Sequence, residues 1–300
     1  MSALTKYLHP EAVARLAAVG FRPHARVAGN LVGNHPSHRH GFAVEFAGHR
    51  QYVPGDNIRH LDWKVYFKSG RYMIKQYEME SNFTAHLLVD ISASMNFEFK
   101  HGRKRDYAGF ISVALASAIL AQTDRVAATF FADEIVREIA PTGSDEIIGT
   151  LADNVEGLPP KDATALGRVL SLTAEHIGRR QVVFVLSDFF GDLTSLFDGL
   201  KRLLFHHNEV ILFHVLDPLE LNFNLPGRVE LIELEGPRRM TIEGRQVRED
   251  YNRRFGAFLR ELRDGARKLG IDYLLCDTSQ NFGITVAKYL NTRLAVGGVK

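Results

Sequence analysis

The sequence predicts an α/β fold with a doubly wound, mostly parallel six-stranded sheet, preceded by a smaller N-terminal region that also contains β-structure. The first observation is a set of short, nearly continuous apolar runs, which are typical of strands buried on both faces of a parallel sheet. The second is that helical stretches separate most of these runs. The third is that each run ends in an aspartate. The runs cover residues 83–90, 125–133, 181–188, 209–217 and 271–277.

The 300 residues suggest roughly two domains, because domains commonly contain about 100–200 residues. Residues 1–82 form the first region. Within it, residues 10–19 have the spacing of a short amphipathic helix, and residues 21–50 show little periodicity. The turn signal Pro54-Gly55-Asp56 follows. Residues 71–80 then alternate polar and apolar side chains, as a half-buried strand does.

Residues 83–300 form the second predicted domain. Helical spacing occurs at residues 106–121, 166–177, 193–204 and 247–269, and the last of these presents one apolar face for packing. Residues 134–141 follow their strand after a tight turn, so we place them as an antiparallel edge strand. Asp133 is then a hairpin residue.

Composition excludes several classes of protein. Hydrophobic residues make up 45% and charged residues 24% of the chain, which is ordinary for a globular protein and excludes a fibrous or disordered one. The single cysteine, Cys276, lies in an apolar run, where we expect a core residue, and it excludes a disulfide scaffold. Neither a signal peptide nor a membrane-spanning run is visible, so we expect a soluble, cytoplasmic protein. Residues 1–82 carry a net charge of +5 and the remainder −3.

Three loop segments suggest a metal site. Asp90, Ser92 and Ser94 follow a buried strand at alternate positions, Thr164 precedes a helix, and Asp188 ends another strand. The carboxyl ends of parallel strands share one sheet edge, and oxygen ligands suit a hard cation such as Mg²⁺, with Mn²⁺ and Ca²⁺ as alternatives. The competing interpretation is that these side chains only cap turns and helices.

This five-residue set resembles the metal-ion-dependent adhesion site (MIDAS) of von Willebrand factor A domains. The resemblance implies that the hydroxyl groups bind the cation directly and that the aspartates act largely through water. Neutral hydroxyl ligands leave the cation's charge incompletely neutralised. It can therefore accept a carboxylate from a partner protein as its last ligand.

A longer set of residues resembles the bacterial family called domain of unknown function 58. Its upstream segment corresponds here to Glu45, Phe46, Arg50, Tyr52, Pro54, Gly55, Asp56, Arg59, Asp62, Trp63 and Lys64, and the closing "YLNTR" also matches. The resemblance implies a von Willebrand A-like domain and a MoxR-type AAA+ ATPase as partner in the assembly or maturation of other proteins. Many relatives carry transmembrane helices, which this chain lacks. "SDFF" also lacks the glycine that many A domains have after the aspartate.

We therefore expect a non-enzymatic, metal-dependent interaction module in which Arg50, Tyr52, Asp56, Arg59, Asp62, Trp63 and Lys64 serve interaction. The alternatives are a nucleic-acid-binding protein that uses the basic, aromatic residues 59–75 and a metal-dependent hydrolase. For Trp63 we expect a packing role. His35, His38 and His40 have the spacing of a zinc site, but no cysteine lies nearby.

Overall fold

A computed structural model describes residues 2–23, 44–53, 61–79, 83–161, 165–232 and 238–297. The chain forms two compact units, of which the smaller is Gly29–Asn82. The larger unit contains a six-stranded sheet in the order β10-β7-β6-β3-β4-β5, parallel except for β5. The strands are β3 (Thr84–Asp90), β4 (Arg125–Phe131), β5 (Ile135–Thr142), β6 (Val182–Ser187), β7 (Glu209–Leu216) and β10 (Asp272–Asp277). The predicted α/β class, six-stranded sheet and antiparallel edge strand are confirmed.

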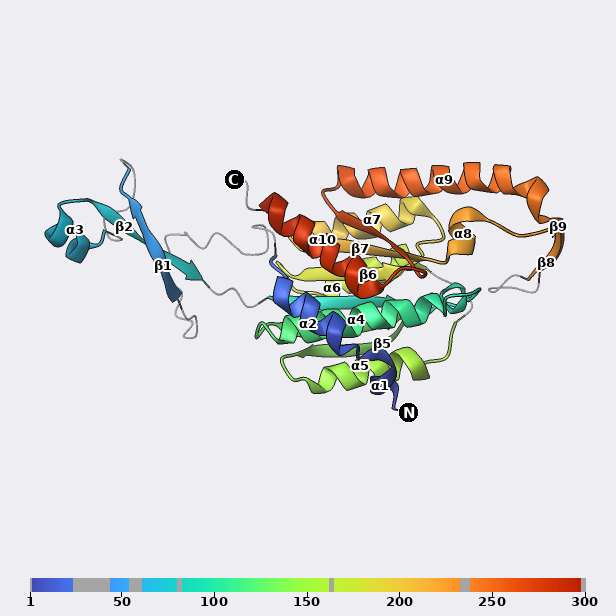
Figure 1. Cartoon of the computed structure of the whole chain (residues 1–300), viewed down its shortest axis with the longest axis horizontal. Coiled ribbons are helices and arrows are strands. Elements are labelled where there is room, and N and C mark those ends of the chain that lie inside the picture. Colours follow the sequence, from blue (N-terminus) through green and yellow to red (C-terminus); the bar gives the residue numbers. More distant parts are fainter. Residues whose placement is uncertain are drawn as a thin grey trace. The chain divides into compact units, whose positions relative to one another are not determined.

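Helices cover both faces of this sheet, as alternating side chains on each strand require. On β3, Leu87 and Val89 pack in one core cluster, whereas Leu88 packs in the other. The first face is covered by α4 (Lys104–Leu120), α5 (Glu146–Gly157) and α10 (Phe282–Gly297). The second is covered by α6 (Leu166–His176), α7 (Leu193–Phe205) and α9 (Gly244–Lys268). Figure 1 shows the helices around the sheet.

The sequence patterns located most of these elements. The helices expected at 106–121, 166–177, 193–204 and 247–269 are α4, α6, α7 and α9, with ends displaced by at most a few residues. Several elements had not been predicted, namely α5, α8 (Pro218–Asn222), α10, the 3-10 helix η2 (Ser94–Asn96) and the antiparallel pair β8 (Arg228–Ile232) and β9 (Arg239–Glu243).

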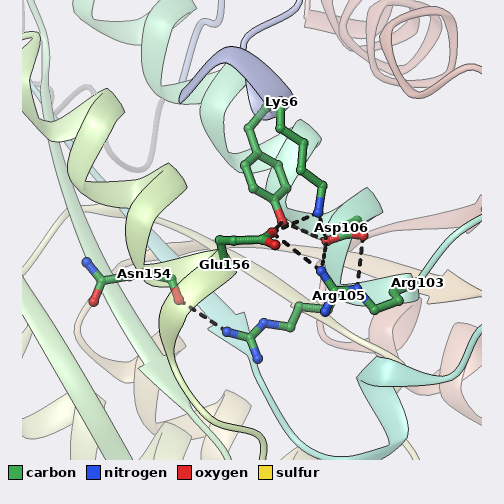
Figure 2. Close-up of polar contacts among 7 residues, drawn as sticks. Lys6, Arg103, Arg105, Asp106, Asn154 and Glu156 are labelled. Carbon is green, nitrogen blue, oxygen red and sulfur yellow. Dashed lines mark hydrogen bonds and ion pairs between the residues drawn. The ribbon is translucent and has the colours of Figure 1, made fainter. Parts of the chain in front are cut away.

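The N-terminal helices α1 (Ala3–Tyr7) and α2 (Pro10–Val19) pack against the larger unit, so the boundary at residue 82 assigns them to the wrong region. The reason is the fully buried ring of Tyr7. Its hydroxyl oxygen lies 2.6 Å from Asp106 of α4 and 2.7 Å from Glu156 of α5, and its single hydrogen can be donated to either carboxylate. Lys6 and Arg103 pair with the same two carboxylates (Figure 2). This ionic cluster fixes the start of the chain to two helices of the core.

Two further features hold the N-terminal segment. Gly109 on α4 allows the close approach of Tyr7, because a Cβ atom there would lie 2.7 Å from the Tyr7 ring. At the other end of the segment, the buried guanidinium of Arg293 donates to the carbonyl oxygen of Arg22 and pairs with Asp272 at 2.8 Å. Arg293 is the arginine of the "YLNTR" segment, so this motif has a structural role.

The smaller unit contains two antiparallel strands, β1 (Val44–Gln51) and β2 (Met73–Met79), and the helix α3 (Trp63–Ser69). The expected strand at 71–80 is β2, whereas β1 and α3 had not been predicted. Asp62 is buried and caps α3, since its carboxylate accepts from the backbone N–H groups of Lys64 and Val65 and also contacts His49 Nε2 at 2.8 Å. Trp63, for which a packing role was expected, is 51% exposed, and its ring lies edge-on to Tyr66 with centroids 6.1 Å apart.

Candidate metal centre

Asp90 and Asp188 flank the point where the order of the sheet reverses. The chain passes from β3 to β4 and β5 on one side and then returns to β6 on the other side of β3. At such a point the connections leave the two neighbouring strands in opposite directions, which opens a crevice at their carboxyl ends. Asp90 is the last residue of β3, and Asp188 directly follows β6. Both are essentially fully buried.

Asp90 and the serine loop form a compact group of oxygen atoms. Asp90 Oδ1 accepts from the backbone N–H of Ser92 at 2.9 Å, and Oδ2 accepts from the hydroxyl of Ser187 at 2.6 Å. The hydroxyl oxygens of Ser92 and Ser94 lie 3.0 Å apart. The structure therefore brings together three of the five predicted residues through direct contacts. Asp90 pairs with no lysine, arginine or histidine of the residues that the structure describes.

Asp188 has a different environment, which the sequence analysis missed. Its Oδ2 accepts from the ammonium group of Lys104 at 2.8 Å, and the same ammonium group donates to Glu220 Oε1 at 2.6 Å. Lys104 is fully buried at the start of α4. Glu220 also accepts a hydrogen bond from the backbone N–H of Asp217 in the capping box of α8. We call Lys104, Asp188 and Glu220 the Lys104 triad.

The electrostatics of the two parts differ accordingly. Burial, together with the nearby charge of Asp188, raises the pKa of Asp90 to about 7, although hydrogen bonds from Ser187 and Ser92 oppose this shift. Burial alone would lower the pKa of Lys104, but the carboxylates of Asp188 and Glu220 outweigh it and raise that pKa. Lys104 is therefore held in its charged form, and Asp90 is the carboxylate whose ionisation a bound cation would favour.

The loop after β6 contains the "SDFF" segment, in which Phe189 follows Asp188. Phe189 has a φ of 53°, in the left-handed region that favours glycine. Its buried ring packs edge-on against His214 of β7, with ring centroids 5.3 Å apart. A phenylalanine thus adopts a backbone conformation that favours glycine, and its buried ring packs against His214. The Asp188 Oδ1 atom accepts from the backbone N–H of Phe190 at 3.3 Å.

The other predicted residues fall into two groups. Thr164, Asp56, Arg59 and the three histidines of the alternative zinc site, His35, His38 and His40, lie outside the described residues. Lys161, which comes shortly before Thr164, forms a bridge with Ser92, and its carbonyl oxygen accepts from the N–H of Ala93 at 2.8 Å. The remaining family-motif residues, Arg50, Tyr52, Asp62, Trp63 and Lys64, belong to the smaller unit.

The other aspartates that end apolar runs have local roles. Asp217 caps α8, Asp277 accepts from the backbone N–H of Ser279 at 2.8 Å, and Asp133 lies in the hairpin between β4 and β5, as predicted. Cys276 is fully buried, and burial raises the pKa of its thiol, so the prediction of a core residue is confirmed.

The donor set fits a small hard cation held by hydroxyl groups. For Mg²⁺ with metal–oxygen distances of about 2.0–2.1 Å, adjacent octahedral ligands are about 2.9 Å apart. The Ser92 and Ser94 hydroxyls are hydrogen-bonded to each other at 3.0 Å, a separation that is also compatible with that spacing. Among the described residues there is no group of three or more His, Cys, Asp or Glu side chains that could hold a metal. A cation here would therefore depend on Ser92, Ser94 and Asp90.

Comparison with known proteins gives the family. The family model described as "Protein of unknown function DUF58" matches residues 48–257. This chain belongs to the DUF58 family. Two relatives of this DUF58 protein are the uncharacterized proteins Rv1480 from Mycobacterium tuberculosis and Mb1516 from Mycobacterium bovis. Each is 23% identical over 289 residues, which is 95% of this chain and 90% of the relative.

Among solved structures, the conserved hypothetical protein BatB from Bacteroides thetaiotaomicron matches with a TM-score of 0.45 and 13% identity, over 71% of this chain and 98% of BatB. An aerotolerance-related membrane protein from Bacteroides fragilis matches with a TM-score of 0.44 and 16% identity, over 70% and 97% of the two chains. In the parts of the DUF58 protein that the structure describes, no helix has the length and apolar character to cross a membrane.

Proposed function

We propose that this DUF58 protein is a non-enzymatic interaction module with a von Willebrand A-like domain, which binds a partner protein through a divalent cation at the carboxyl edge of its sheet. The observation that carries the proposal is the pair of hydroxyls on Ser92 and Ser94, 3.0 Å apart, beside the buried carboxylate of Asp90. Mg²⁺ is the cation whose ligand spacing agrees best with that distance.

The chemistry of the site supports binding rather than turnover. Two neutral hydroxyls and one carboxylate neutralise only half of a divalent charge. The cation would keep a strong attraction for a further anionic ligand, and a carboxylate on a partner protein supplies one. The resemblance to the family adds a candidate for that partner, a MoxR-type AAA+ ATPase.

Calorimetric titration with Mg²⁺ tests the proposal. The wild-type chain is expected to bind the ion, and Asp90→Asn, which keeps the size of the side chain but removes its charge, is expected to lose at least about tenfold in affinity. Asp133→Asn is the matched control, because Asp133 also follows a strand of the sheet but is exposed in a hairpin. If the wild type binds neither Mg²⁺, Mn²⁺ nor Ca²⁺, alone or with a MoxR-type ATPase, the proposal is wrong.

A second candidate function is supported by the surface of the smaller unit. On α3, Trp63 and Phe67 lie one turn apart and are 51% and 82% exposed, and Lys64 and Lys68 are exposed beside them. Exposed aromatic rings next to basic side chains can stack on the bases of a single-stranded nucleic acid and contact its phosphates. This arrangement favours the nucleic-acid alternative more than the sequence did.

Oligonucleotide binding distinguishes this second function. A single-stranded probe is expected to bind with an affinity that falls steeply with salt, because basic side chains release counterions from the phosphates. Phe67→Ala should weaken that binding by about 1–3 kcal/mol if its ring stacks on a base. A gel-shift series at low salt that shows no complex would exclude this function without affecting the metal proposal.

A further inference from the structure

A lysine side chain lies inside the sheet edge at which the cation is proposed to bind. The ammonium group of Lys104 is enclosed by two carboxylates, at 2.8 Å from Asp188 and 2.6 Å from Glu220. Two aromatic rings complete its surroundings, with centroids 5.9 Å away for Phe97 and 5.1 Å away for Phe190. The side chain of Lys104 has no exposed surface. Its position is therefore fixed by charge and by packing on every side.

The ammonium group of Lys104 adds positive electrostatic potential at the sheet edge where a cation would bind. Asp188 follows β6, and Asp90 ends the neighbouring strand β3, so the two carboxylates share the edge of the sheet. A positive charge that neutralises Asp188 reduces the negative potential at Asp90, Ser92 and Ser94. In a buried site this effect is strong, because solvent screens it little.

We propose that Lys104 is a built-in cation that lowers the affinity of the edge site for a divalent ion by neutralising Asp188 and repelling the ion. This inference rests on the proposed function and specifies how its site is regulated. With Asp188 held by Lys104, the carboxylate that the described residues leave to the ion is that of Asp90. A weakly held ion is stabilised most by the additional carboxylate of a partner, so ion binding and partner binding reinforce each other.

The test compares Mg²⁺ affinity in wild type, Lys104→Met and Lys104→Gln by calorimetry. Both variants remove the charge, and Lys104→Gln retains a hydrogen-bond donor for Asp188. Each is expected to bind Mg²⁺ at least about tenfold more tightly than wild type. The control is Lys100→Met, which removes an exposed lysine four positions earlier and should leave the affinity unchanged. Thermal unfolding with and without Mg²⁺ gives a second readout, and the stabilisation by Mg²⁺ should be larger in the Lys104 variants.

The outcomes separate this inference from the proposed function. If wild type binds Mg²⁺ and the two Lys104 variants bind it equally or more weakly, Lys104 does not oppose the ion and the inference is wrong. If only the Lys104 variants bind, Lys104 opposes the ion as inferred, but the proposed function of the wild-type chain fails. If no variant binds, the metal proposal and the inference both fail. If Lys104→Met does not fold, the test uses the double variant Lys104→Met with Glu220→Gln and compares it with Glu220→Gln alone. The second change removes one of the two carboxylates that Lys104→Met leaves unpaired.

Discussion

The hydroxyl group of Tyr7 offers a sharp test of how the N-terminal helix is held. Tyr7→Phe removes one O–H group and retains the buried ring. That hydroxyl lies 2.6 Å from Asp106 and 2.7 Å from Glu156. A hydrogen bond to a charged group contributes about 1.5–3 kcal/mol when it is buried. The Asp106 side chain is only 15% exposed, so a hydrogen bond to it counts as buried. Glu156 is 43% exposed, so water can replace a hydrogen bond lost there.

We therefore expect Tyr7→Phe to lower the free energy of unfolding by about 2 kcal/mol, nearly all of it from the bond to Asp106. Lys6 and Arg103 remain to neutralise both carboxylates, so the loss should not reach the value for an unpaired buried charge. Tyr72→Phe is the control. Among the described residues, its hydroxyl contacts Tyr66 alone, at 3.3 Å on an exposed surface, and its removal should change stability by less than about 0.5 kcal/mol.

The assay must follow the larger unit. The only tryptophan, Trp63, belongs to the smaller unit, so its fluorescence reports on the wrong part of the chain. Far-ultraviolet circular dichroism during urea unfolding follows the helices of the larger unit. Tyr7→Phe should shift this transition and leave the fluorescence transition in place. A circular dichroism midpoint within error of the wild type would refute the assigned role of the hydroxyl.

Three further predictions follow from burial and close packing. The pKa of Asp90 in the folded protein is about 7, above its ordinary value of 3.8. With a chelator present to keep the site free of metal, the contribution of Asp90 to stability is therefore present below about pH 4 and lost as pH rises through about 7. Asp90→Asn should remove the part of that loss that falls between pH 5 and pH 8, which is about 3 kcal/mol, as measured by urea unfolding at those two pH values. Burial lowers the pKa of His86 to about 4, so wild type should lose up to about 3 kcal/mol between pH 6.5 and 4, and His86→Gln should not. Gly167→Ala should cost more than about 2 kcal/mol, because its Cβ would lie 2.2 Å from the Ser195 hydroxyl. Gly149→Ala, in open space on α5, should instead stabilise by about 0.5–1 kcal/mol, as measured by thermal unfolding.

The sequence predicted the sheet well because its strands are buried on both faces. Such strands are apolar along their whole length, and the aspartates after them mark where each strand ends. The positions of Asp90, Ser92 and Asp188 followed from this pattern and from the rule that parallel strands end at one edge. In the structure Asp90 contacts Ser92, whereas Asp188 pairs with Lys104.

Lys104 could not be predicted in the same way. It lies in the run Arg103-Lys104-Arg105-Asp106, which is typical of a solvated helix start. Its burial depends on Asp188 and Glu220, 84 and 116 residues away in the sequence. The sequence likewise predicted the 17-residue helix α4 but did not show that most of its surface is covered. That coverage depends on packing against α1, α2, α5 and α10. Local patterns show which residues can be buried, whereas partners distant in sequence determine which ones are.

The packing of α2 against α10 has a consequence for how the protein is made. The contact between Arg293 and Arg22 joins residues separated by 271 positions, and the two helices cover the same face of the sheet. During synthesis, the apolar residues Ala12 and Leu16 of α2 emerge first but cannot complete their packing until the last helix has left the ribosome. Contacts of such long range form slowly. Premature termination before α10 would thus yield a chain with an uncovered apolar face and a tendency to aggregate.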